Sequence, residues 1–158
     1  FGNTFPEPEA KLASFPLVFG LDGKSKMSKQ VGNDIEIALS DEETVERVMT
    51  AVTDPARRYR ADPGHPEICN IYKLDAYFNP SQREYFAGQC RQATIGCVEH
   101  KQILAEAINT ALKPVRERRT KLATEHQYIA DILADGARRA RVIARKTLKE
   151  VKQKMGLV

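Results

Sequence analysis

A short basic stretch, Lys24-Ser25-Lys26-Met27-Ser28-Lys29-Gln30, carries the side chains of this sequence best suited to binding phosphate. Glycines at positions 20 and 23 precede it and allow a backbone to approach a ligand closely, while lysine ammonium and serine hydroxyl groups supply hydrogen-bond donors. This composition predicts a polyphosphate-binding loop, although a solvated basic turn would have the same composition. A P-loop is excluded, because the glycine that its pattern requires five residues before Gly23 is replaced by Val18.

The segment Lys26-Met27-Ser28-Lys29-Gln30 resembles the KMSKS signature of class I aminoacyl-tRNA synthetases. Its surroundings are similar to those of one family, the bacterial-type tryptophanyl-tRNA synthetases. The resembling segments follow one another from about Phe5 to the C-terminus: Phe5-Pro6-Glu7-Pro8, Gly20-Leu21-Asp22-Gly23, Gly32-Asn33-Asp34-Ile35, Val52-Thr53-Asp54-Pro55, Ile95-Gly96-Cys97, residues 114–119 and residues 136–141. The resemblance implies an enzyme that joins tryptophan to ATP as an aminoacyl-adenylate, releases pyrophosphate and transfers the aminoacyl group to tRNA(Trp).

The resemblance also implies a role for each residue of the segment 26–30. Lys26 and Lys29 match the two motif lysines, which meet the negative charge that builds on the phosphates in the transition state, and Lys29 is expected at the leaving pyrophosphate. Met27 matches the residue whose backbone lies near adenine, and Ser28 matches a hydrogen-bond donor on the phosphate side. Gln30 occupies the position of the motif's last serine, so a longer amide replaces a hydroxyl donor there.

The family's other signature, an H-x-G-H type motif, does not occur in this sequence, because His65, His100 and His126 lie outside such a context. The resemblance therefore implies the C-terminal part of a synthetase, inactive by itself, which in the full-length enzyme would be a cytoplasmic homodimer using ATP with Mg²⁺. No metal is expected on this chain, since the histidines share no ligand spacing with a cysteine or carboxylate. Two alternatives stay open: a tyrosyl-type or other class I synthetase, and a non-catalytic tRNA-binding module derived from one, which Gln30 would suit.

Charge is unevenly distributed along the 158 residues, whose net charge is +4. From residue 113 onward there are 13 Lys or Arg against 5 Asp or Glu, whereas the residues before carry 12 against 16. A basic last third is expected of a nucleic-acid contact, although a solvated helix face would also produce it. No run of 18 apolar residues and no signal segment occur, so no membrane segment is expected. Three cysteines without a C-x-x-C pair argue against a disulfide framework and a zinc site.

Two domains are predicted: residues 1–32 as the end of a Rossmann-like catalytic domain, and residues 33–158 as a helical bundle that binds the anticodon. In the first, the apolar residues 15–19 predict a short buried strand. In the second, hydrophobic periodicity predicts a helix opened by a capping box at Ser40 and Glu43. Two further helices are predicted over 67–78 and from a second capping box at Ser81 and Glu84 to about 92. The next is predicted over 98–112, with a break or kink at Pro114 and a polar helical segment to about 124. The last two are predicted over 128–133, with an end near Gly136, and over 140–155.

The resemblance implies that basic side chains of the helical domain contact tRNA. Arg57 and Arg58 follow the helix stop at Asp54-Pro55, and Lys101 lies in the first turn of a long helix, so Arg58 and Lys101 are expected to contact bases. Arg138 and Arg141 begin a stripe at helical spacing that is expected to contact the phosphate backbone.

Overall fold

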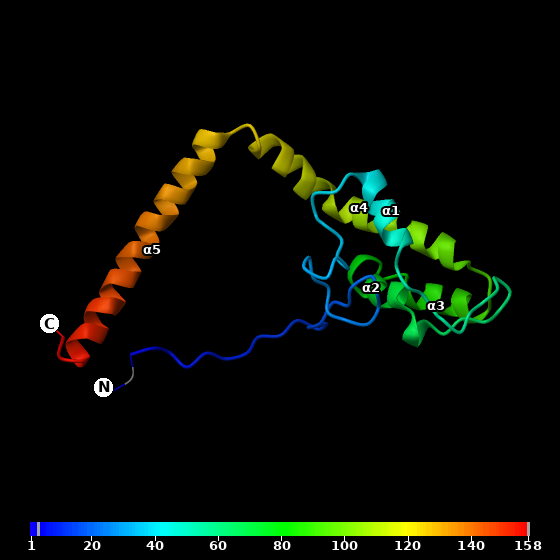
Figure 1. Ribbon diagram of the computed structural model, residues 1–158, viewed down its shortest axis with the longest axis horizontal. Coiled ribbons are helices and arrows are strands. Elements are labelled where there is room, and N and C mark those ends of the chain that lie inside the picture. Colours follow the sequence, from blue (N-terminus) through cyan, green and yellow to red (C-terminus); the bar gives the residue numbers. More distant parts are fainter. Residues whose placement is uncertain (3, 158) are drawn as a thin grey trace. The chain divides into compact units, whose positions relative to one another are not determined.

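A computed structural model describes residues 1–2 and 4–157, and the described chain is mainly helical, as the sequence predicts (Figure 1). Its helices in chain order are α1 (Asp41–Met49), the 3₁₀ helix η1 (Pro66–Ile68), α2 (Asn70–Phe78), α3 (Arg83–Arg91), α4 (Cys97–Leu122) and α5 (His126–Lys154). Contacts within the chain define a larger unit, Ser14–Glu117, and a smaller unit formed by Phe1–Ala13 and Arg118–Val158. The functional division between residues 32 and 33 stays a prediction.

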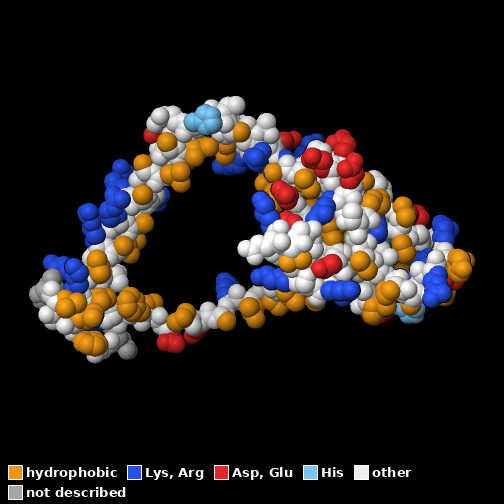
Figure 2. Space-filling view, in the orientation of Figure 1, with side chains coloured by type: hydrophobic (Ala, Val, Ile, Leu, Met, Phe, Trp, Pro, Cys, Tyr) orange, Lys and Arg blue, Asp and Glu red, His pale blue; other side chains and the backbone are white. Residues whose placement is uncertain are grey.

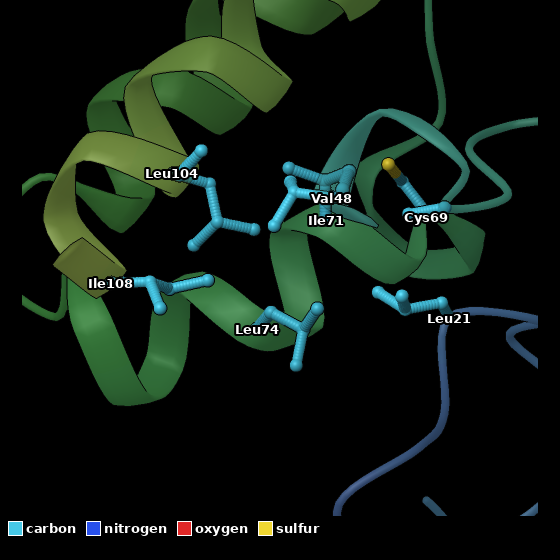
Figure 3. Close-up of a cluster of buried hydrophobic side chains, with 9 residues drawn as sticks. Leu21, Val48, Cys69, Ile71, Leu74, Leu104 and Ile108 are labelled. Carbon is cyan, nitrogen blue, oxygen red and sulfur yellow. The ribbon is translucent and has the colours of Figure 1, made fainter. Parts of the chain in front are cut away.

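One cluster of buried apolar side chains forms the main core of the larger unit (Figure 3). Val48 comes from α1, Ile71 and Leu74 from α2, and Leu104 and Ile108 from α4, and each is at most 1% exposed. Leu21, which belongs to residues 20–33, here named the basic loop, is buried in the same cluster. The basic loop is therefore attached directly to the helical core, where burial of each large apolar side chain contributes about 1.5–3 kcal/mol.

A polar pair lies inside the larger unit between α2 and α4. Nε2 of His100 lies 2.7 Å from Oδ2 of Asp75, and both residues are buried. The His100 ring also packs against Phe86 of α3, with a centroid separation of 4.9 Å. Because a buried carboxylate must be hydrogen-bonded to be tolerated, this pair fixes the register between α2 and α4.

The first capping box forms as the sequence predicts. The backbone N–H of Glu43 donates to Oγ of Ser40 over 3.1 Å, and the N–H of Ser40 donates to Oε2 of Glu43 over 2.8 Å. The prediction of a second capping box at Ser81 and Glu84 is wrong, because α3 begins at Arg83 with Gln82 as its N-cap and without a side-chain cap.

Two helices continue through residues at which the sequence predicts an interruption. At Pro114, where a break or kink is predicted, α4 is not broken but continues to Leu122, so the polar helical segment predicted to about 124 is part of this helix, and Arg116 ties it to α1. The guanidinium of Arg116 donates to Asp41 Oδ1 over 2.7 Å and to Thr44 Oγ1 over 2.7 Å. The predicted end near Gly136 is also wrong, because a glycine costs only about 1 kcal/mol inside a helix and α5 runs through it.

The predicted buried strand at 15–19 is wrong as well. Among the described residues this segment makes one isolated β-bridge, between Phe19 and Lys26, while Phe15 and Leu17 are 46% and 45% exposed. A strand is stable only with neighbouring strands, and no described strand pairs with this one. The predicted helix over 67–78 is divided into η1 and α2.

In the smaller unit, the 29-residue helix α5 has no buried residue among those described. Nζ of Lys154 donates to Oγ1 of Thr4 over 3.0 Å and lies 2.9 Å from Oε1 of Glu150, which ties the end of α5 to the N-terminal segment of the same unit. Within the described part of the chain, no helix has the length and apolarity needed to cross a membrane.

Candidate functional site

The basic loop, residues 20–33, closes on itself through backbone hydrogen bonds. The N–H of Met27 donates to the carbonyl of Val18 over 2.9 Å, beside the bridge between Phe19 and Lys26. At the two ends of the loop, the N–H of Leu21 donates to the carbonyl of Asn33 over 2.7 Å. Because Leu21 is buried in the core, both ends are fixed to the helices.

Asn33 is the centre of the loop, and its side chain is buried beneath the turn. Its Nδ2 donates to Oδ2 of Asp22 over 3.0 Å and to Oγ of Ser25 over 2.9 Å. Its Oδ1 accepts the N–H of Ser28 over 2.7 Å. A Cβ at position 20 would overlap the Asn33 amide, so only glycine there leaves room for this side chain. One amide therefore holds both halves of the loop.

Asp22 completes this internal network. Its carboxylate accepts hydrogen bonds from the Oγ hydroxyl of Ser25 over 2.7 Å and from the N–H of Lys24 over 3.0 Å, in addition to the bond from the Asn33 amide. These hydrogen bonds, that of the Ser25 side chain above all, hold the pKa of Asp22 well below its usual range. The carboxylate is consequently ionised at neutral pH and places one negative charge among three lysines.

Helices α1 and α2 support the loop from outside. Asn70 at the start of α2 is buried, and its Nδ2 donates to the carbonyl of Gly20 over 2.8 Å. Arg47 of α1 donates from Nε to the carbonyl of Asp34 over 2.9 Å and from Nη2 to the carbonyl of Gly32. The residues on both sides of the basic stretch are thus tied to the helical core.

The predicted loop residues fall into two groups on this scaffold. Lys26, Lys29 and Gln30 are exposed, whereas Ser28 is half-buried and Met27 packs against the core. Chemically, the loop presents two motif lysines to an anionic ligand from a backbone that is held in place. Sequence reasoning missed Asn33 as the residue that organises the loop, although the segment Gly32-Asn33-Asp34-Ile35 drew attention to it.

Two of the predicted tRNA-contacting residues bind carbonyl groups of their own chain. Nη2 of Arg57 donates to the carbonyls of Arg60 and Ile95, over 2.6 Å and 2.9 Å. Nζ of Lys101 donates to the carbonyl of Met49 at the end of α1 over 2.8 Å, and burial lowers the pKa of this lysine. Arg57 and Lys101 thereby join the loop after α1, the turn before α4 and the end of α1.

The other predicted tRNA-contacting residues are exposed. Arg58 lies on the surface of the larger unit. Arg138 and Arg141 are exposed on α5, where Arg138 forms an ion pair with Asp135, and Arg139 contacts the same carboxylate over 2.8 Å. Figure 2 shows Lys and Arg side chains gathered along one side of α5 and apolar side chains along another. The structure places Arg58 in one unit and the α5 arginines in the other.

Comparison with known proteins identifies the family. The family model described as tRNA synthetases class I (W and Y) matches residues 1–113. The chain belongs to the class I tRNA synthetases for tryptophan and tyrosine. The resemblance to the tryptophanyl members of this family, which the sequence motifs indicate, is confirmed by the relatives that the chain matches.

Two curated relatives carry the name tryptophan–tRNA ligase. The Thermotoga maritima protein is 38% identical over 160 residues, which cover 100% of this chain and 48% of that protein. The Aquifex aeolicus protein is 38% identical over 159 residues, which cover 99% of this chain and 40% of that protein. The chain thus spans about half the length of the curated relatives it matches.

A solved structure extends this comparison to the fold. The tryptophanyl-tRNA synthetase of Campylobacter jejuni, complexed with ADP and tryptophan, superimposes with a TM-score of 0.79 at 31% identity. The match covers 98% of this chain and 48% of the Campylobacter chain. Across residues 1–2 and 4–157 of this chain, no three His, Cys, Asp or Glu side chains are grouped so as to hold a metal ion.

Proposed function

We propose that this chain forms the part of a tryptophan–tRNA ligase that contains the phosphate-binding loop, in residues 1–32, and a tRNA-binding helical domain, in residues 33–158. One observation carries the proposal: the Asn33 side chain fixes the loop backbone while the motif lysines Lys26 and Lys29 remain exposed. A cationic loop held in this way meets developing charge without first having to be ordered. The names of the relatives and the ADP and tryptophan of the Campylobacter structure support the choice of substrates.

In the proposed reaction, the carboxylate of tryptophan attacks the α-phosphorus of ATP and forms a new P–O bond. The bond from that phosphorus to the bridging oxygen breaks, and its electron pair leaves with pyrophosphate. Lys29, assisted by Lys26, binds the phosphate oxygens on which this charge accumulates, so that it stabilises the transition state more than the ground state. A ribose hydroxyl of tRNA then attacks the carbonyl carbon, and AMP leaves.

The remaining loop residues bind and orient ATP. Ser28 donates from its hydroxyl group, since its backbone N–H already donates to Asn33. The backbone of Met27 lies near adenine, and its side chain anchors the loop to the core. Gln30 provides an amide donor in place of the motif's last serine. Mg²⁺ enters with ATP, as part of the substrate.

For tRNA, we assign direct contacts to Arg58, Arg138 and Arg141, which are exposed. Arg57 and Lys101 support tRNA binding indirectly, by holding the surrounding backbone in place, because their charged groups bind carbonyls of this chain. In a full-length member of the family (below, the family-length enzyme), which we expect to be a homodimer, these contacts hold the anticodon arm while the acceptor end receives tryptophan.

Pyrophosphate exchange tests the catalytic part of this proposal. A family-length protein carrying these residues is expected to exchange pyrophosphate into ATP with tryptophan and not with tyrosine. The 158-residue chain alone, which lacks an H-x-G-H type motif, is expected to bind tRNA(Trp) without catalysing exchange. Exchange with tyrosine would assign the chain to the tyrosyl members of the family, and absence of any exchange by the family-length protein would leave only an RNA-binding module.

A further inference from the structure

Residues 34–39, here named the connecting segment, link the basic loop to the start of α1. All of them are described, and none belongs to a helix or strand. Backbone carbonyl groups in such a segment need partners from outside it. Nε of Arg47 donates to the carbonyl of Asp34 over 2.9 Å, and Nε of Arg116 donates to the carbonyl of Ile37 over 3.1 Å. Two arginine side chains therefore hold the backbone of the connecting segment.

The guanidinium group of Arg116 joins the connecting segment to two helices. In the first turn of α1, it donates to Oδ1 of Asp41 and to Oγ1 of Thr44, in each case over 2.7 Å. On α4 it donates to Oδ1 of Asn109, seven residues earlier, over 2.8 Å. The Arg116 side chain is only 14% exposed. Because the donors of a planar guanidinium point in fixed directions, these bonds together determine where the Ile37 carbonyl lies relative to α1 and α4.

The helices that hold Arg116 are themselves anchored in the core of the larger unit. Val48 of α1 and Ile108 of α4 are completely buried there. Ile37, whose carbonyl Arg116 fixes, lies four residues after Asn33, the residue that holds both halves of the basic loop. The position of the core helices is thereby passed to the C-terminal end of the loop.

We propose that Arg116 is a positioning residue for adenylate formation, which acts through the connecting segment on the positions of Lys26 and Lys29. Its own donors bind groups of this chain, so it aligns the lysines that bind the phosphates and contacts no substrate. A misplacement of about 1 Å in a reacting group can slow a reaction about 100-fold. This inference rests on the function proposed above and adds a residue of α4 that lies outside the lysine motif.

Pyrophosphate exchange by the family-length enzyme tests this role with Arg116→Lys. Lysine keeps the charge, but its single nitrogen cannot reproduce the spread of the guanidinium donors. We expect kcat to fall by about 10- to 100-fold and KM for tryptophan to stay the same. Rates are expressed per tryptophan-binding site, so that unfolded enzyme is not counted. Arg119→Lys, at an exposed position of the same helix, is the matched control and should keep the rate.

A double-mutant cycle separates positioning from a general loss of structure. If Arg116 acts through the loop, Arg116→Lys should slow exchange by a smaller factor in an enzyme that already carries Lys29→Ala, because one of the groups that it aligns is absent. A residue that only stabilises the helices would slow exchange by the same factor with and without Lys29.

Hydrogen exchange in the 158-residue chain follows the same contact without any activity. The amide of Ser28, which donates to Asn33, is expected to exchange faster in Arg116→Lys than in the unchanged chain. The amide of Ile108, in the buried part of α4, should exchange at the same rate in both. Equal acceleration at both amides would indicate global destabilisation and would contradict a positioning role.

The outcomes distinguish this inference from the function on which it rests. An unchanged kcat in Arg116→Lys, or an equal loss with and without Lys29, would overturn the role of Arg116 and leave the ligase assignment intact. Absence of exchange by the unchanged family-length enzyme would overturn the proposed activity and the role of Arg116 in it together.

Discussion

The Asn33 amide donates to the Asp22 carboxylate over 3.0 Å, across 11 positions of the chain, and its other end accepts the N–H of Ser28. Because Ser28 lies between the motif lysines, the two side chains determine where the backbone of the motif lies. Because hydrogen bonds to a charged group are stronger than those between neutral groups, this pair favours the observed conformation of the loop.

A double exchange of this pair tests its role. Asn33→Asp places two carboxylates together and is expected to slow adenylate formation in a family-length enzyme by about 10- to 100-fold. Asp22→Asn with Asn33→Asp restores a donor and an acceptor in reversed order, and we expect it to recover part of the rate. Hydrogen exchange at the Ser28 amide of the 158-residue chain follows the same contact without any activity. A double variant no faster than Asn33→Asp would show that the pair does not act directly.

Replacement of Lys29 tests the transition-state contact. Lys29→Ala in a family-length enzyme is expected to slow adenylate formation by about two to three orders of magnitude, the usual loss of one preorganised transition-state donor. The affinity for tryptophan should stay the same, because the proposal assigns Lys29 to the phosphates of ATP and not to the amino acid. Lys24→Ala, which removes an exposed lysine outside the motif, is the matched control. Equal rates for Lys29→Ala and the unchanged enzyme would exclude Lys29 from the mechanism.

Arginine variants separate phosphate contacts from base contacts in tRNA. Arg138→Ala and Arg141→Ala are expected to weaken cognate and anticodon-swapped tRNA alike and to flatten the salt dependence. Arg58→Ala should instead reduce discrimination between the two tRNAs by about 1–3 kcal/mol. Lys101→Ala should mainly lower the free energy of unfolding, by about 1 kcal/mol, since its ammonium group caps α1 at Met49. The measurements are tRNA titrations over a salt series and urea unfolding; loss of discrimination in Lys101→Ala at unchanged stability would return that residue to the RNA contact.

Acid should destabilise the chain through Asp54. Burial of this carboxyl group raises its pKa, but hydrogen bonds from the His65 side chain and from the backbone of Ala56 and His65 prevail and lower the pKa below its ordinary 3.8. A carboxyl group with a lower pKa in the folded state contributes stability above its unfolded pKa and loses it as the pH falls through the folded pKa. Urea unfolding from about pH 5 to about pH 2 should therefore show a smaller loss in Asp54→Asn than in the unchanged chain. Asp131→Asn, an exposed site on α5, is the control, and parallel curves for Asp54→Asn and the unchanged chain would contradict this.

Local patterns in the sequence predict the features that depend on neighbouring residues. The capping box at Ser40 and Glu43 is complete within four residues, so it forms wherever that helix forms. The similar pattern at Ser81 and Glu84 fails because a turn closes first, with the N–H of Gln82 donating to the carbonyl of Asn79 over 3.1 Å, and α3 starts after it.

Features that depend on contacts between residues far apart in the chain could not be predicted from local sequence patterns. The continuation of α4 through Pro114 is accompanied by bonds from Arg116 to Asp41 and Thr44, more than 70 positions away. Likewise, composition identifies Lys26 and Lys29 as phosphate-binding candidates, but the role of Asn33 emerges only when the fold places it beneath the loop.

Because Leu21 is buried in the helical core, ligand binding to the basic loop can be detected by thermal unfolding of the chain. When the core melts, the anchor at Leu21 and the hydrogen bond from Asn70 to Gly20 are lost together, so the unfolded chain has no ordered loop for a ligand. Anything that binds the loop must then shift the unfolding equilibrium, by about 2.7 kcal/mol at a concentration 100 times its dissociation constant. The melting temperature of the chain should accordingly rise with the concentration of pyrophosphate or ATP, so that ligand binding to the loop lysines can be measured by thermal unfolding without an activity assay.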